Sequence, residues 1–100
     1  MARDFRGQLT LPAATATNLL ALLAAAGFTS TGLAVQLTIK EAASDIYRGT
    51  DNTVTNANGE LIASGASDNE QGLVDLAKIW LYSVPGTTFS CKVQGHRGGC

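Results

Sequence analysis

The chain has 100 residues, of which 45% are hydrophobic and 15% charged, and its net charge is −1. A chain of this length buries roughly 60–70% of its unfolded surface, so one domain can fold without a metal or a disulfide. The low charge provides no basic field for nucleic acid, and the apolar block Leu19 to Ala26 is much shorter than the ~20 residues that cross a bilayer. We therefore expect neither nucleic acid nor a membrane as a partner.

Residues 1–12 are predicted to form an N-terminal arm and first strand. Apolar and polar residues alternate from residue 5 to residue 11, and Pro12 ends the pattern. No apolar run follows the charges near the N-terminus, so the sequence predicts no signal peptide. We expect cytosol-like surroundings, in which Cys91 and Cys100 remain thiols.

A short helix is predicted next, from a Thr15 cap to a left-handed stop at Gly27. Its leucines lie on one side and must cover a core, because so short a helix is unstable alone. Phe28 is expected to close back on Leu23 in a Schellman motif. Residues 33–40 alternate most clearly and predict a half-buried strand. Its inward-facing residues are expected to be Leu33, Val35, Leu37 and Ile39.

The middle of the chain is predicted to contain short strands separated by polar turns. Strands are expected at residues 46–48, at residues 61–63 and, less regularly, around Val54. Asn58-Gly59 is a strong turn signal. Residues 64–72 are predicted to be a polar surface loop. Asp75 is expected to accept a backbone hydrogen bond in a tight helical turn within residues 73–78.

The C-terminal third is predicted to form a hairpin that organises the core. Residues 79–84 and 88–93 alternate and are joined by Pro85-Gly86, which favours a turn. The expected register gives one core face with Trp80, Tyr82, Phe89, Cys91 and Val93. Ile79 and Leu81 then lie on the second face, where either the helix or another subunit must cover them.

No pattern predicts catalysis, a cofactor or a metal. The single His96 lies in a Gly-rich tail, residues 95–100, which is predicted to be flexible and lacks the rigid geometry of a site. Asp68, Glu70 and nearby Asp75 lack the spacing of a calcium loop. No Ser lies in a nucleophile elbow. The sequence therefore predicts that the protein is not an enzyme.

Short strands spaced by turn signals, with one helix, predict a mainly β fold. We expect a β-sandwich or jelly-roll-like domain with one short N-terminal α-helix. The expected organisation is an arm and first strand at 1–12, the β-sandwich at 13–94 and the tail at 95–100.

From Ile46 onward the sequence resembles a class of small virion proteins of tailed bacteriophages. The matching pieces are Ile46-Tyr47-Arg48-Gly49, Val54-Thr55, Asn58-Gly59, Leu61 to Gly65, Leu76 to Leu81 and Phe89 to Val93. The resemblance covers about half the chain and is a pattern of turns and strands. Two residues depart from this pattern: Arg48, and Trp80, which stands where Tyr is usual.

The resemblance implies a β-sandwich or jelly-roll module that cements or decorates a capsid, or that forms part of a head or tail fibre. We therefore expect a structural virion protein, made in the host cytoplasm, that binds the major capsid protein non-covalently and forms a homo-oligomer. The candidate interface residues are Phe5, Arg6, Ile79 and Leu81. The alternatives are a head–tail connector or tail component and a carbohydrate- or ligand-binding β-sandwich module. The carbohydrate- or ligand-binding module is disfavoured, because such modules usually expose aromatic residues, whereas all aromatic residues here fall at strand or helix-cap positions.

Overall fold

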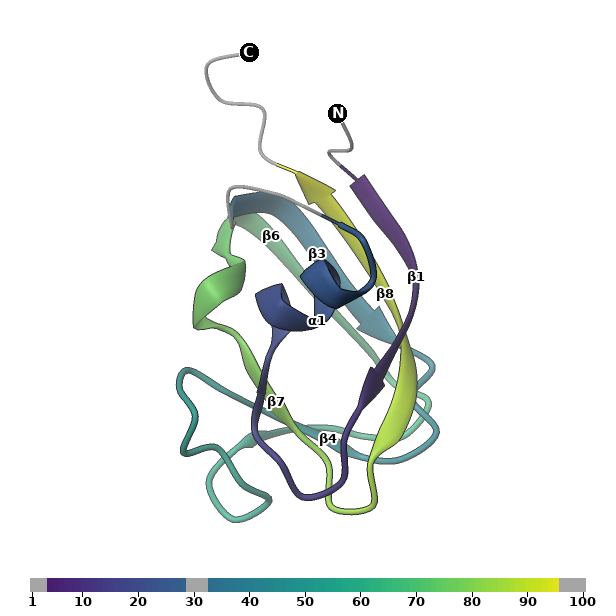
Figure 1. The fold of residues 1–100 in the computed structure, drawn as a ribbon, viewed down its shortest axis with the longest axis vertical. Coiled ribbons are helices and arrows are strands. Elements are labelled where there is room, and N and C mark those ends of the chain that lie inside the picture. The colour runs from purple at the N-terminus through teal and green to yellow at the C-terminus, as the bar shows by residue number, and fades with distance from the viewer. Residues whose placement is uncertain (1–3, 29–32, 96–100) are drawn as a thin grey trace.

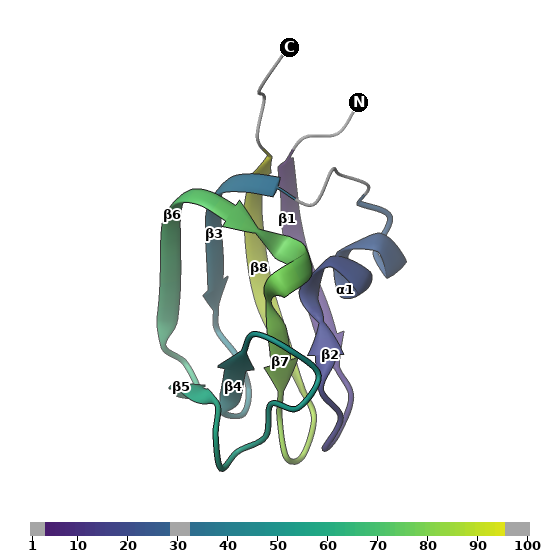
Figure 2. The ribbon, with the colours of Figure 1, turned by 90° about the vertical axis from the view of Figure 1, so that its left-hand side faces the viewer.

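A computed structural model of the protein describes residues 4–28 and 33–95, in which two antiparallel sheets have four strands each (Figure 1). In chain order the elements are β1 (Asp4–Leu11), β2 (Thr17–Asn18), α1 (Leu19–Ala25), β3 (Leu33–Lys40), β4 (Ile46–Gly49), β5 (Glu60–Ile62), β6 (Ser67–Asp75), the 3-10 helix η1 (Leu76–Lys78), β7 (Trp80–Tyr82) and β8 (Thr87–Gly95). The long sheet has the strand order β1-β8-β3-β6, and the short sheet has the order β2-β7-β4-β5. The sheets form two layers, which confirms the predicted β-sandwich with one short helix (Figure 2).

The strands pair like one long hairpin that has been folded over into two layers. β1 pairs with β8, β2 with β7, β3 with β6 and β4 with β5, so each pair is nested inside the one before it. Pairing of β3 with β8 and of β4 with β7 completes the sheets. Two sheets with this nested order are the arrangement of a jelly roll. The start of β1 and the end of β8 consequently lie at the same end of the molecule (Figure 1).

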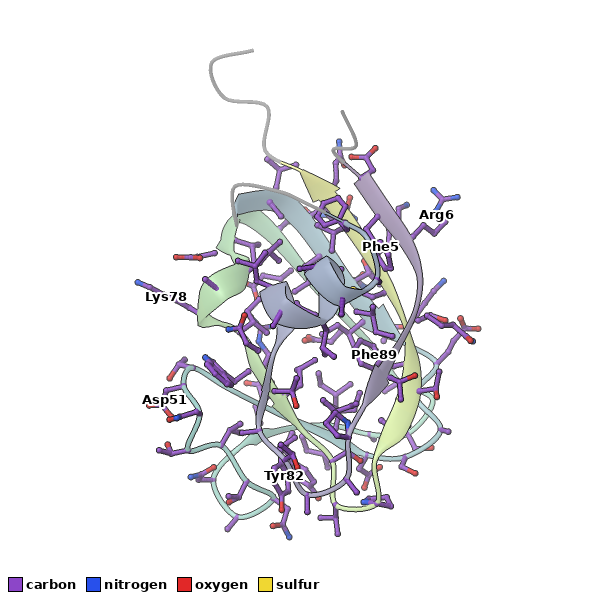
Figure 3. All side chains as sticks on the ribbon, viewed as in Figure 1. Phe5, Arg6, Asp51, Lys78, Tyr82 and Phe89 are labelled. Carbon is purple, nitrogen blue, oxygen red and sulfur yellow. The ribbon has the colours of Figure 1, made fainter. Side chains whose placement is uncertain are left out.

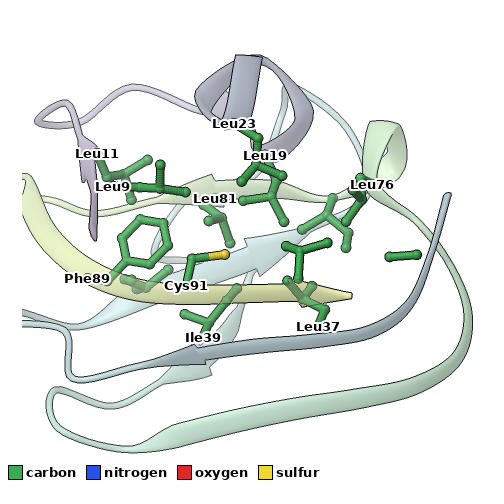
Figure 4. Close-up of a cluster of buried hydrophobic side chains, with 14 of the residues drawn as sticks. Leu9, Leu11, Leu19, Leu23, Leu37, Ile39, Leu76, Leu81, Phe89 and Cys91 are labelled. Atoms are coloured by element: carbon green, nitrogen blue, oxygen red, sulfur yellow. The ribbon is translucent and has the colours of Figure 1, made fainter. Parts of the chain in front are cut away.

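The core lies between the sheets. Phe89 of the long sheet and Leu81 of the short sheet are both fully buried in it (Figure 4). α1 closes the sandwich on the side of β1 and β2 (Figure 2) and adds Leu19 and Leu23 to the same cluster. Each side chain of this size contributes about 1.5–3 kcal/mol when buried. The cluster is therefore the main source of stability.

The helix begins later than predicted. Its N-cap is Asn18 rather than Thr15, and the Asn18 Oδ1 accepts a hydrogen bond from the Ala21 N–H at 3.2 Å. β2 pairs with β7 immediately before the helix. Because those residues must be extended to form that pairing, the helix cannot start at Thr15.

The predicted end of the helix is confirmed. Gly27 has a φ of +94°, the left-handed region that favours glycine. The Phe28 N–H donates to the Leu23 carbonyl at 2.9 Å, and the Gly27 N–H donates to that of Ala24 at 3.0 Å. This is the Schellman pattern, and it brings the buried Phe28 side chain into the core.

The predicted hairpin between residues 79–84 and 88–93 is wrong. β7 pairs with β2 and β4, whereas β8 pairs with β1 and β3, so Pro85-Gly86 lies in a connection between two sheets. The phase of the first segment is opposite to the prediction, and its buried residues are Ile79, Leu81 and Ser83. Trp80 and Tyr82 are half-buried on the outer side of the short sheet and are not core residues.

The predicted strand at residues 33–40 is confirmed, but its register shifts between Ala34 and Gln36. Ala34 is fully buried in consequence, while Val35, predicted to face the core, is only half-buried. The tight turn after β6 is also confirmed. The Asp75 Oδ1 accepts a hydrogen bond from the Ala77 N–H at 3.1 Å at the start of η1.

Two polar segments differ from their predictions. The predicted loop at residues 64–72 holds only for residues 64–66, because β6 begins at Ser67 and pairs with β3. The segment around Val54 forms turns rather than a strand. Gly95 belongs to β8, and the rest of the predicted tail, including His96 and Cys100, lies outside the described residues.

Cys91 is buried as predicted, with 2% of its surface exposed, and burial raises the pKa of its thiol to about 12 from an ordinary value of 9.0. Above pH 9 the unfolded chain loses a proton that the folded protein keeps. The stability that the protein owes to keeping this thiol protonated is therefore complete below pH 9, and it is lost as the pH rises toward 12. We expect Cys91→Ala to remove that loss. Between pH 7 and pH 10, urea unfolding should show the parent losing about 1.4 kcal/mol more than the variant. Equal losses in the two proteins would contradict this account of the thiol.

Candidate docking surface

The outer face of the short sheet carries the only Trp and both Tyr residues of the chain. Tyr47 of β4 lies opposite Leu61 of β5 on one side and Tyr82 of β7 on the other. Residues that are opposite in neighbouring strands share a face and contact each other. Trp80 lies two residues before Tyr82 and therefore on the same side of β7. Val84 borders a hollow of about 350 Å³ together with Tyr47.

We call this surface the aromatic face, and it consists of Tyr47, Leu61, Trp80, Tyr82 and Val84. Among the described residues, the exposed large hydrophobic ones are Leu61 and Val84, with 53% and 50% of their surface exposed. Both lie on this face. Its three aromatic residues are half-buried. The face is thus an apolar patch with aromatic residues at its centre and exposed aliphatic residues at its edges.

The loop between β4 and β5 packs onto the aromatic face, and it crosses in front of the short sheet in Figure 2. Its Val54 is 4% exposed but is not part of the main core cluster. A Cβ atom on Gly49 would lie 2.5 Å from the Val54 Cβ, and one on Gly59 would lie 2.7 Å from the Tyr47 Cβ. These contacts require glycine at both positions. They hold the loop against the sheet beside Tyr47.

Hydrogen bonds within the loop fix its shape. The Asp51 Oδ1 accepts from the Thr53 N–H at 2.9 Å and from the Thr53 hydroxyl. These bonds lower the pKa of the Asp51 carboxyl, the side-chain bond contributing most. The Asn58 side chain accepts from the Thr55 N–H at 2.7 Å and donates to the Thr53 carbonyl at 3.1 Å. The loop is therefore preorganised, which reduces the entropy that a binding partner must remove.

Two of the four predicted interface residues are wrong. Ile79 and Leu81 have 3% and 0% of their surface exposed and lie in the core. The Leu19 N–H donates to the Ile79 carbonyl at 2.9 Å, which attaches the start of α1 to this segment. The helix and the long sheet cover these side chains, so another subunit cannot contact them.

Of the predicted N-terminal arm and first strand, the described part is a strand, β1, and not an extended arm. β1 pairs with β8 along its whole length, whereas residues 1–3 lie outside the described residues. Phe5 is half-buried and packs edge-on against Phe28, with the ring centroids 5.8 Å apart. Arg6 is exposed and projects away from the molecule (Figure 3). Only Arg6 remains available as the prediction requires.

The side of the sandwich between β4 and β6 is closed by charges. The Arg48 guanidinium lies 3.2 Å from an Asp68 carboxylate oxygen and also pairs with Glu70. Arg48 is 19% exposed, and its partners come from the other sheet. The sequence spacing of these carboxylates does not match a calcium loop. The structure gives them a role in joining the sheets.

The site offers contact area rather than reactive groups. In residues 4–28 and 33–95, no three His, Cys, Asp or Glu side chains are grouped to hold a metal. The helices in that part of the chain are too short or too polar to cross a membrane. Sequence reasoning missed the aromatic face because it placed Trp80 and Tyr82 in the core. The sequence did contain a signal for this second face. Residues 79–84 are mostly apolar at both odd and even positions, which is typical of a strand whose two faces are both covered.

The fold and this surface together define a small jelly-roll domain with an aromatic outer face on one sheet. Comparisons with protein families, with curated proteins and with solved structures find no match for the chain.

Proposed function

We propose that the protein is a non-enzymatic structural component of a tailed-phage virion, specifically a capsid cement or decoration protein. It is made in the host cytoplasm and binds the major capsid protein non-covalently through the aromatic face. Many copies attach to the repeated lattice as a homo-oligomer, so contacts that are weak singly become strong together. The sequence resemblance between Ile46 and Val93 supports this class of protein.

The aromatic face is the observation that carries the proposal. Protein interfaces are enriched in Tyr and Trp, and these residues account for much of the binding energy at their centres. Here Trp80, Tyr82 and Tyr47 form such a centre, and the exposed Leu61 and Val84 surround it. Apolar side chains gathered on one face are typical of a surface that a partner covers.

The fold supports the proposal by analogy alone. Jelly rolls occur in viral capsid proteins, but also in lectins and cupins. The same fold therefore serves several functions, and the site must decide between them.

Capsid binding tests the proposal. Empty capsids that lack this protein are mixed with the purified chain, heated and sedimented. Trp80→Ala and Tyr82→Ala are each expected to weaken attachment about 30-fold, because removal of a hot-spot aromatic costs about 2 kcal/mol. Leu61→Asp should also reduce attachment, since it places a charge in the contact.

Thr10→Asp is the matched control, because it adds the same charge at an exposed position of the long sheet. It should bind like the parent, and circular dichroism should show that all four variants are folded. Attachment unchanged by the three aromatic-face variants would place the capsid contact elsewhere. If the parent itself does not sediment with capsids, the proposed function is wrong.

The aromatic face also reopens the carbohydrate-binding alternative. The strand positions of the aromatic residues do not disfavour this class, because Tyr47, Trp80 and Tyr82 lie on the outer face of their sheet. The exposed aliphatic groups of Leu61 and Val84 nevertheless suit a protein better than a sugar. Binding to a glycan array that depends on Trp80, without capsid attachment, would favour the carbohydrate reading. Sedimentation with tails rather than heads would favour a connector or tail component.

A further inference from the structure

The outer face of the long sheet, opposite the aromatic face, brings three cationic side chains together. Arg6 of β1 lies directly opposite Lys92 of β8. Lys40 of β3 lies opposite Ser90, which is two residues from Lys92 on β8, and Gln8 flanks Ser90 from β1. Because side chains alternate along a strand, all five project from the same face.

These side chains border one hollow of about 470 Å³. Its lining includes Arg6, Gln8, Lys40, Glu41, Ser90 and Lys92. Three cations therefore face one carboxylate, and the hollow carries an excess of positive charge.

Within residues 4–28 and 33–95, none of these three cations is joined to a carboxylate in an ion pair, and Asp4 lies beside Arg6 and Lys92 in an adjoining hollow. The described residues contain five Lys and Arg side chains, and the ion pairs among them are those of Arg48. The remaining cations are Lys78, which lies on η1, and the three side chains of this hollow. Like charges directly opposite in a sheet are destabilising. Arg6 and Lys92 form such a pair, so an anion between them would remove a repulsion.

We propose that this hollow binds a tetrahedral oxyanion, a phosphate or sulfate group. A guanidinium can donate two hydrogen bonds to such a group, and two ammonium groups add charge-assisted bonds. The Ser90 hydroxyl and the Gln8 amide are further donors on the same face. The site is on the opposite sheet from the aromatic face, so both can be occupied at once. It therefore goes beyond the proposed function and does not depend on it.

Titration of the ¹⁵N-labelled full chain with sodium phosphate and sodium sulfate tests the site. Sodium chloride at equal ionic strength corrects for screening. We expect saturable shifts of the backbone amides of Gln8, Ser90 and Lys92. The double variant Arg6→Gln/Lys92→Gln should bind about tenfold more weakly, since it loses two charge-assisted contacts. All three residues changed in the variant and its control are exposed, so the fold should be retained.

Lys78→Gln is the matched control, because it removes one charge on the other side of the molecule (Figure 3). It should bind both anions like the parent. Shifts no larger than those in sodium chloride, or an equal loss in Lys78→Gln and the double variant, would overturn the proposal.

Two polymers then identify the source of the group. A sulfated polysaccharide that competes with phosphate for these amides would identify a glycan. A DNA duplex that competes instead would identify nucleic acid and would contradict the expectation of no nucleic-acid partner. Either result supports the site, whereas shifts confined to residues outside the hollow would refute it.

Discussion

Leu81→Asp is expected to unfold the domain, whereas the same substitution at Leu61 should leave it folded. Leu81 has 0% of its surface exposed and belongs to the core, while Leu61 is 53% exposed on the outer face of the same sheet. Removal of a buried leucine side chain costs about 2–5 kcal/mol, and an unpaired buried carboxylate costs several kcal/mol more. The sum is comparable to the whole stability of a domain, about 5–15 kcal/mol.

Circular dichroism and urea unfolding measure this contrast directly. The Leu61→Asp variant should keep a β spectrum and lie within about 0.5 kcal/mol of the parent, as exposed substitutions usually do. Leu81→Ala provides an intermediate case that stays folded with a reduced urea midpoint. A folded Leu81→Asp variant with parental stability would mean that this side chain faces solvent, and the assignment of the two faces of β7 would be reversed.

Arg48→Met is expected to destabilise the domain by about 1–3 kcal/mol. The change removes the cation that joins Asp68 and Glu70 of β6 to the short sheet. Two inward-facing carboxylates would then remain between the sheets without a partner. Removal of one member of a buried ion pair costs about 3–5 kcal/mol, and the partial exposure of this cluster reduces the figure.

The triple variant Arg48→Met/Asp68→Asn/Glu70→Gln separates the ion pair from packing. It removes the uncompensated charges together with the cation, so it should recover most of the lost stability. Urea unfolding of the single and triple variants gives the comparison. If Arg48→Met is as stable as the parent, solvent rather than Arg48 satisfies the two carboxylates.

Features that depend on neighbouring residues were predicted from the sequence. Gly27 and Phe28 end α1 as expected, because a Schellman motif is formed within six residues. The Asp75 bond at η1 and the strand at residues 33–40 also follow from local patterns. In each case the hydrogen bonds or the alternation involve residues that are close in the chain.

Features that depend on distant strands were not predicted. Residues 67–71 are polar, and they form part of β6 because β3 supplies hydrogen bonds on one side and Arg48 pairs with the inward carboxylates. The helix starts at Leu19 because β2 first pairs with β7, some 60 residues away in the chain. None of these partners can be identified from the segment itself.

The candidate site shows the same division. Among the predicted interface residues, Arg6 is exposed, whereas Ile79 and Leu81 are core residues. The sequence-based assignment of Trp80 and Tyr82 to the core has the same cause as the wrong interface prediction. It assumed that residues 79–84 pair with residues 88–93 in a hairpin, and that hairpin does not form.

The sequence by itself therefore determined the mainly β class, the single helix with its glycine stop, and the burial of Cys91. Only the tertiary structure decided which face of β7 is covered. Residues 79–84 are apolar on both sides, so alternation alone is compatible with either orientation. The choice is made by the nesting of β7 between β2 and β4, which places Leu81 under α1 and the long sheet and leaves Trp80 and Tyr82 outside.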